Sequence, residues 1–222
     1  MPDGQSWYSS FWTYLEFAWE DLLSLAFEHA VIVAEALAIA TLVGVALGVA
    51  TYRTERPREL VLGVTGTFLT IPSLALFPLF IPIFGLGATS VLVGLVMYGL
   101  LPVTRNTIVG LREVDPAVVE SAQGMGMSRT RRMLRIELPL AWPVILTGMR
   151  VSAVLLVGIA AIGAYVSGPG LGNDIFAGIT NFGSASSLNL ILGGTLGIVI
   201  LAIFFDLLFS VIFRITTPKG IR

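Results

Sequence analysis

The sequence predicts an all-α integral membrane protein with five transmembrane helices, with its N-terminus outside the cytoplasm and its C-terminus inside. Of the 222 residues, 55% are hydrophobic and 12% are charged, and the mean hydropathy is +0.89. A soluble domain has about 25% charged residues. Five apolar runs reach the roughly 20 residues that a membrane-spanning helix needs. The basic residues fall on one side of this arrangement or near its edge, and basic segments stay in the cytoplasm.

Residues 1–28 are predicted to form an extracytoplasmic segment at the membrane interface. They contain no Lys or Arg, so they lack the basic start of a secretory signal peptide. Acidic residues alternate with aromatic ones, as in Trp12, Glu16 and Trp19, a pattern that suits a helix lying at the boundary of water and lipid. A poorly ordered leader is the alternative. We expect His29 at the same boundary, without a catalytic role.

The transmembrane domain is predicted to cover residues 29–215, followed by a cytoplasmic tail at 216–222. Basic residues cluster after the first, third and fifth runs, whereas the N-terminus, the 84–88 turn and the 167–187 loop contain none. Because the two ends lie on opposite sides, the number of spans must be odd, so the charge asymmetry and the count of five runs agree independently. The runs cover residues 29–51, 60–84, 88–108, 141–166 and 188–213.

The second run contains three prolines, Pro72, Pro78 and Pro82. Proline removes a helix hydrogen bond and kinks the chain, and a broken helix is tolerated in a membrane where protein or a water-lined path covers it. The run is therefore either a pore-lining or gating helix, or a kinked helix that only packs against its neighbours.

A polar, basic segment, residues 112–139, interrupts the apolar runs and is cytoplasmic by the charge rule. The segment Glu120–Met125 predicts a short helix, and Ser128 can cap a second helix that continues through Arg135, with Gly126 available for the turn. A helix–turn–helix in a protein with otherwise short loops indicates a docking element. The alternatives are a solvated charged loop, or a patch of arginines that binds anionic lipid.

The chain lacks the residues that most catalytic and nucleotide sites require. It contains no cysteine, and His29 is its only histidine. The only lysine is Lys219, so no Gly-Lys-Ser/Thr phosphate-binding loop is present. We therefore expect no cofactor or metal in this chain, and any ATP that drives it must bind to another polypeptide.

Several charged residues fall inside apolar runs, where charges are costly and usually functional. Arg150 and Asp206 are at similar depths, roughly 10–14 Å from the cytoplasmic ends of the fourth and fifth runs at 1.5 Å rise per residue. We expect them to form an ion pair. The alternative is that each side chain extends separately to the inner interface. Glu35 lies in the outer third of the first run, too far away in depth to pair with Arg150.

Several short motifs occur in order along the chain. Glu120 begins a Glu-x-Ala pattern that is followed by Gly126 and by the Ile-x-Leu-Pro segment Ile136–Pro139. This pattern resembles the EAA loop with which ABC importer permeases dock on their ATPase, although Ser121 replaces the first alanine. Together with the remaining motifs, it resembles the permeases of osmoprotectant importers, over about residues 29–215. The remaining motifs are Ile71–Phe77, Leu100–Thr107, Gly110–Leu111, Val114–Pro116 and Gly168–Gly172.

The resemblance implies a type I ABC importer permease fold in a prokaryotic cell membrane, with no nucleic acid partner. It implies that two permeases, copies or paralogues, assemble with two ABC ATPases that bind ATP and Mg, and with an extracytoplasmic substrate-binding protein. This chain would then be a transport subunit and not an enzyme. The implied ATPase-coupling residues are Glu120, Ser121, Ala122, Gly126, Arg129, Arg132, Ile136, Leu138 and Pro139.

The substrates implied by the resemblance are glycine betaine, choline, carnitine and proline betaine. A quaternary ammonium cannot donate hydrogen bonds, so aromatic faces are its natural partners. For each aromatic side chain, ordinary packing is the alternative role. Two alternative functions of the chain remain open. It is a permease for another solute, such as methionine or an aliphatic sulfonate, or it is a membrane scaffold or membrane-embedded enzyme. The candidate residues of the translocation path are Pro72, Ser73, Phe77, Tyr98, Asn106 and Tyr165.

Overall fold

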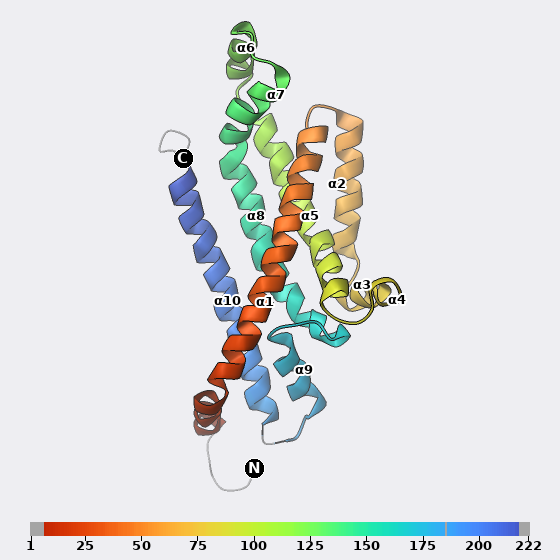
Figure 1. Ribbon diagram of the computed structural model, residues 1–222, viewed down its shortest axis with the longest axis vertical. Helices are drawn as coiled ribbons and strands as arrows, with labels where there is room; N and C mark the ends of the chain where they lie inside the picture. The colour runs from red at the N-terminus through yellow and green to blue at the C-terminus, as the bar shows by residue number, and fades with distance from the viewer. Residues whose placement is uncertain (1–6, 185, 218–222) are drawn as a thin grey trace. The chain divides into compact units, whose positions relative to one another are not determined.

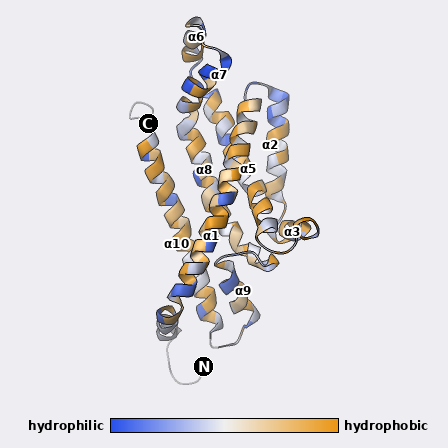
Figure 2. Cartoon of the chain, viewed as in Figure 1, coloured by the Kyte–Doolittle hydropathy of each residue, from blue (hydrophilic) through white to orange (hydrophobic). Residues whose placement is uncertain are grey.

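The computed structural model describes residues 7–184 and 186–217, and all regular secondary structure in this part of the chain is helical (Figure 1). Figure 2 shows that the long helices are mainly hydrophobic. The expected tail lies largely outside the described residues, as does Lys219. The helices are α1 (Trp7–Thr51), α2 (Glu55–Thr70), α3 (Ser73–Leu79), α4 (Ile81–Phe84), α5 (Ala88–Arg112), α6 (Pro116–Gly124), α7 (Arg129–Arg132), the π-helix η1 (Met133–Glu137), α8 (Leu138–Ala160), the 3₁₀-helix η2 (Ala161–Val166), α9 (Gly172–Thr180) and α10 (Ser187–Thr216).

The described chain divides into two compact units that differ in charge. All of its arginines lie in the second unit, whereas His29 is the only basic side chain described in the first. The charge asymmetry seen in the sequence therefore follows the division into units. The first unit comprises the described residues up to Ala36, Ile71–Leu95 and Val154–Phe204, and the second comprises Leu37–Thr70, Val96–Ala153 and the described residues from Phe205 on.

Four helical segments are long and apolar enough to cross a membrane, namely α1, α5, the segment Arg129–Val166 and α10. They contain the first, third, fourth and fifth predicted runs. The second run, 60–84, in which the three prolines predict a kink, is not one straight helix. The chain bends by 102° between α2 and the pair α3–α4, which together pass the same test of length and hydropathy. The count is five if this bent pair is one span.

Proline explains the break in the second run. Pro72 is the residue before α3, with an extended backbone (φ −60°, ψ 134°), and a residue that precedes proline is pushed out of the helical region. Helix α2 therefore ends at Thr70, before Ile71 and Pro72. Pro82 lies in the first turn of α4, where its missing N–H costs nothing.

Helix α1 runs without interruption through the predicted boundary at residue 28. Its 45 residues correspond to a length of about 68 Å, more than twice the roughly 30 Å of a hydrocarbon core. The expected boundary between an interfacial helix and a separate first span is therefore absent from the secondary structure. The placement of residues 1–28 at the membrane interface stays a prediction.

His29 lies in the interior of the first unit, and its expected depth at the membrane boundary stays a prediction. Its side chain is fully buried, and its Nε2 lies 2.9 Å from the carbonyl oxygen of Val157, to which it donates. Gly170, with a φ of +106°, packs so closely that a Cβ there would lie 2.8 Å from the imidazole Nδ1. The glycine-rich segment after η2 thus covers the histidine.

Glycines bring the helices of the second unit into backbone contact. A Cβ on Gly48 of α1 would lie 2.6 Å from the side chain of Thr107 on α5, and one on Gly110 of α5 would lie 2.9 Å from the carbonyl oxygen of Ala141 on α8. Small residues at such positions let helices pack closely in lipid, where dispersion contacts replace the hydrophobic effect. The core of this unit is formed by Tyr52, Ile108, Leu111, Met133, Ala141 and Ile145.

We predict that Gly48→Ala destabilises the protein by about 1–3 kcal/mol, because the added methyl overpacks the contact with Thr107. Gly63→Ala is the matched control, since a Cβ on Gly63 meets no atom within 4 Å. Thermal unfolding of the purified protein in detergent measures both effects. Equal melting temperatures for the two variants would contradict this account of the α1–α5 contact.

Candidate functional site

The polar segment that follows α5 folds into the two short helices α6 and α7. The carboxylate of Asp115 accepts a hydrogen bond of 2.8 Å from the backbone N–H of Ala117, which caps α6, and Pro116 occupies the first helical position. Ser128 caps α7 by accepting from the N–H of Arg131 at 3.4 Å. The two helices therefore start at residues whose side chains satisfy free backbone donors.

The turn between the two helices depends on Gly126. Its φ of +77° lies in the left-handed region, which disfavours residues with a Cβ. The N–H of Gly126 donates to Gln123 at 2.9 Å, and the N–H of Met127 donates to Ala122 at 3.1 Å. This pair of bonds is the Schellman arrangement that ends helices. The predicted helix, turn and Ser128 cap are present, with α6 starting at Pro116 rather than Glu120.

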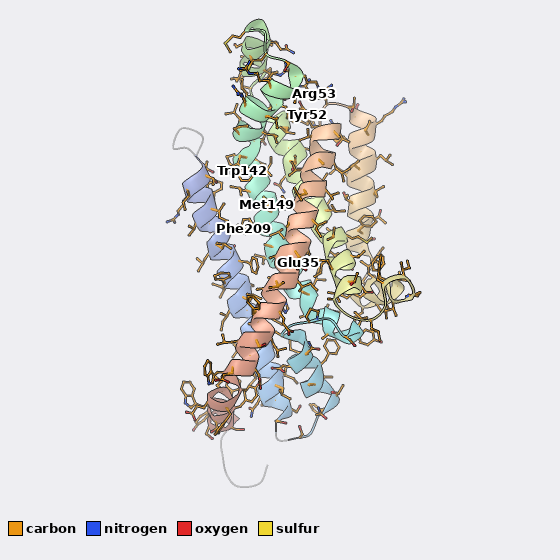
Figure 3. All side chains as sticks on the ribbon, in the orientation of Figure 1. Glu35, Tyr52, Arg53, Trp142, Met149 and Phe209 are labelled. Atoms are coloured by element: carbon orange, nitrogen blue, oxygen red, sulfur yellow. The ribbon has the colours of Figure 1, made fainter. Side chains whose placement is uncertain are left out.

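A buried carboxylate joins the end of this segment to the end of α1. Glu137, only 1% exposed, accepts from Arg132 Nε at 2.8 Å and from Arg53 Nη2 at 3.2 Å. The hydroxyl of Tyr52 donates to Glu137 Oε2 at 2.6 Å and accepts from Arg53 Nε. Figure 3 shows Tyr52 and Arg53 at the end of α1. We call Tyr52, Arg53, Arg132 and Glu137 the Glu137 cluster.

The π-helix η1 supports the pairing within the Glu137 cluster. Arg132 and Glu137 are five residues apart, whereas side chains on a regular α-helix meet at spacings of three or four. The wider turn of η1, which covers Met133–Glu137, is formed by i→i+5 backbone bonds and so suits this spacing. Burial, followed by the hydrogen bond to Glu137, raises the pKa of Tyr52, so its hydroxyl stays protonated and donates to the carboxylate.

The predicted coupling residues divide between an outer face and an inner face of the segment. Ala122 and Arg132 are buried, and Ile136 and Leu138 are half-buried. The outer residues are free to contact another protein, while the inner ones hold the segment on its own unit. The exposed members of the set are Glu120, Ser121, Gly126, Arg129 and Pro139.

The structure also brings Arg150 and Asp206 together, as expected from their depths. Arg150 on α8 donates from Nε to Asp206 Oδ1 at 2.6 Å and from Nη2 to Oδ2 at 2.7 Å, so the pair is bidentate. The side chains are 44% and 40% exposed, so in water the pair would contribute little stability. In a membrane, pairing spares two charges from contacting hydrocarbon separately.

The candidate residues of the translocation path are divided between the two units, with Tyr98 and Asn106 in the second and the other four in the first, and their common path stays a prediction. Phe77 is fully buried, with Gly94 packed against its ring, and Tyr98 is 3% exposed. Tyr165 is 60% exposed, and Asn106 donates to the carbonyl oxygen of Pro102 at 2.8 Å. Phe77 and Tyr98 are therefore both buried in this conformation. Pro72 is exposed and Ser73 half-buried.

Three residues of the Glu137 cluster, Tyr52, Arg53 and Glu137, were missed by the sequence analysis. Glu137 is the variable position of the Ile-x-Leu-Pro motif, and Tyr52 directly follows the first apolar run. One signal was available for Glu137, because it is a lone acidic residue close to four arginines at the edge of an apolar run. No signal in the sequence pairs it with Tyr52, 85 positions away.

Comparisons with known proteins show which family this chain belongs to. The profile of a family described as the binding-protein-dependent transport system inner membrane component matches residues 40–219. The glycine betaine/carnitine/choline transport system permease protein OpuCB of Bacillus subtilis is 36% identical over 210 residues, 95% of each chain. The osmoprotectant import permease protein OsmW of Salmonella typhimurium is 39% identical over 206 residues, 90% of this chain and 94% of that one.

Among solved structures, a chain of the MetNI methionine ABC transporter in an inward-facing conformation superposes with a TM-score of 0.77. The match covers 89% of this chain and 96% of the other, at 21% sequence identity. At that identity the likeness is one of fold.

We predict that Glu137→Gln lowers the free energy of unfolding by about 3–5 kcal/mol, because it leaves Arg132 buried without a counter-charge. Tyr52→Phe removes one hydrogen bond and is expected to cost about 1 kcal/mol. Glu120→Gln, at an exposed position, is the control and is expected to change stability by less than about 0.5 kcal/mol. Denaturation in detergent ranks the three variants, and a Glu137→Gln protein as stable as the parent would refute the pairing.

Proposed function

Because this chain belongs to the family of binding-protein-dependent transport system inner membrane components, we propose that it is the permease of an ATP-driven importer of quaternary-amine osmoprotectants. Glycine betaine, choline, carnitine and proline betaine are its proposed substrates. The observation that carries the proposal is the near full-length similarity to OpuCB and OsmW, whose names state such substrates. The similarity to the methionine transporter is one of fold, so it does not favour methionine as the substrate.

The proposed assembly contains two copies of an ABC ATPase, a second permease and an extracytoplasmic substrate-binding protein. The sequence has no phosphate-binding loop, so ATP and Mg bind to the ATPase and this chain performs no hydrolysis. The proposed topology has five spans, with the bent pair α2 and α3–α4 counted as one. The arginine-rich segments between and after the spans then lie on the cytoplasmic side, in accord with the charge rule.

The exposed face of α6 and α7 is the proposed contact with the ATPase. Ala122 and Arg132 are turned inward, and the Glu137 cluster ties the end of the segment to Tyr52 and Arg53 after α1. Because α7, η1 and α8 follow one another without a loop, displacement of α7 by the ATPase is passed directly to α8. In this way nucleotide-driven motion reaches the membrane-spanning helices.

We predict that Gly126→Val uncouples transport from ATP hydrolysis while the protein remains in the membrane. The left-handed φ of Gly126 is unfavourable for a residue with a Cβ by roughly 1–2 kcal/mol, so the turn between α6 and α7 changes. Since a Cβ there meets no atom within 4 Å, the effect is one of backbone conformation and not of packing. Uptake and ATPase activity are measured in parallel.

Gly124→Val is the matched control for this experiment, because Gly124 ends α6 and a Cβ there is also free of contacts within 4 Å. We expect its uptake to stay near that of the parent. Normal uptake and normal ATPase association in the Gly126→Val protein would show that the turn has no part in coupling.

The substrate proposal is tested by uptake into proteoliposomes that contain the permease, the ATPase and the binding protein. We expect ATP-dependent uptake of at least one of radiolabelled glycine betaine, choline, carnitine and proline betaine, because the relatives that match most of this chain are named for such solutes. Uptake of methionine or an aliphatic sulfonate, with no response to the four osmolytes, would replace the proposed substrate class.

A further inference from the structure

The ion pair of Arg150 and Asp206 lies within candidate membrane spans but is only partly covered by protein. Arg150 is on α8 and Asp206 on α10, each inside a helical segment that is long and apolar enough to cross a membrane. Both residues belong to the second unit, and their side chains are 44% and 40% exposed. Figure 3 labels the nearby Met149 on α8 and Phe209 on α10. Whatever surrounds this part of the two helices therefore contacts both charges.

Water is the surrounding that suits this partly exposed pair. Contact with hydrocarbon is costly for charged side chains, and ionisable residues inside membrane proteins face water-filled cavities or one another. An apolar protein surface placed over the pair would remove its water, at a cost that the attraction between the two charges only partly offsets. Thr147 and Val151, on the same face of α8 as Arg150, are exposed as well. A protein that carries polar solutes across a membrane needs a water-filled path, and this face of α8 is suited to line it.

The hydrogen bonds of the pair leave one edge of the guanidinium group free. Asp206 occupies the edge formed by Nε and Nη2 of Arg150, at distances of 2.6 and 2.7 Å. A guanidinium group has five N–H donors, and within the described residues Nη1 of Arg150 donates to no protein group. Nη1 and Nη2 form a second fork of donors, and such forks bind a carboxylate with two hydrogen bonds. Arg150 can therefore bind a second carboxylate while it stays paired with Asp206.

We propose that Arg150 lines the water-filled path and binds the carboxylate of a zwitterionic substrate on this free edge. The inference rests on the proposed function, which names glycine betaine, carnitine and proline betaine as substrates, each with a carboxylate and a quaternary ammonium. The ammonium of the substrate offsets the repulsion between its carboxylate and Asp206. Choline has the ammonium but no carboxylate, so it cannot use the free edge. Arg150 thus makes the permease favour zwitterionic osmolytes over choline.

The first test compares the uptake of a radiolabelled zwitterionic osmolyte with that of choline, in proteoliposomes that contain the complete importer and saturating substrate. The binding protein is the same in every sample, so a change in the ratio of the two rates originates in the permease. Arg150→Lys keeps a positive charge beside Asp206 but removes the fork. We expect it to lower the ratio of zwitterion to choline uptake about tenfold, which corresponds to the loss of one charge-assisted hydrogen bond. Arg150→Gln/Asp206→Asn, which leaves no lone charge in the membrane, is expected to lower the ratio as much.

The matched control is Arg56→Lys, which makes the same substitution at an exposed arginine of the same unit and is expected to leave the ratio unchanged. An unchanged ratio in both Arg150 variants overturns the inference and leaves the proposed function standing. A parent that imports choline but no zwitterionic osmolyte overturns the inference too, and a parent that imports none of these solutes overturns both. If the parent imports no choline, the same fall is expected in zwitterion uptake per ATP hydrolysed.

The second test measures whether water reaches the pair. Because the chain has no cysteine, Val151→Cys places a single thiol beside Arg150, at a position that is 50% exposed. We expect it to react with a membrane-impermeant thiol reagent that carries a trimethylammonium group, and to be protected by a saturating zwitterionic osmolyte. Val64→Cys, at a 48% exposed position of α2 in the same unit, is the control and is expected to stay unreacted. No reaction at position 151, or equal reaction at both positions, overturns the placement of Arg150 in the path.

Discussion

The buried carboxylate of Glu137 is the constraint on which the polar segment depends. Burying a charge costs several kcal/mol unless it is paired and its remaining acceptor positions are filled. Here Arg132 donates from the same helical segment, while Tyr52 and Arg53 donate from the end of α1. The carboxylate is therefore satisfied only when α7, η1 and the end of α1 take these positions together. This requirement fixes the segment on its unit without the large apolar core that so short a helix pair cannot form.

The same arrangement gives the segment two faces with different roles. Arg132 and Ala122 are turned inward, whereas Glu120, Ser121 and Arg129 are free on the outside. A rigid inner face is what a coupling element needs, because motion imposed on the outer face is otherwise absorbed by the loop. The direct succession of α7, η1 and α8 serves the same end. In the proposed importer, the ATPase contacts the outer face, and the inner face carries the displacement into the membrane.

Local rules were enough to predict the parts of the site that depend on neighbouring residues. The Ser128 cap and the turn at Gly126 follow from residue type and position, and the Arg150–Asp206 pair follows from matched depth and the cost of a lone charge in lipid. Two features depend on packing that the local pattern does not predict. His29 resembles an interfacial residue, but Val157 and Gly170 enclose it. Tyr52 and Glu137 come together only in the tertiary structure. The five-residue spacing between Arg132 and Glu137 requires a π-helix, which the sequence pattern does not predict.

The most direct test of the account is a cross-link between the polar segment and the ATPase. The chain has no cysteine, so Ser121→Cys provides a single reactive thiol on the outer face, and Asn181→Cys provides an exposed control in the first unit. A reagent that joins thiol to amine is applied to the detergent-extracted complex. The account predicts a cross-link to the ATPase from position 121 and not from 181, with a lower yield when Glu137→Gln is added. Equal cross-linking from both positions, or none from 121 in an intact complex, would contradict it.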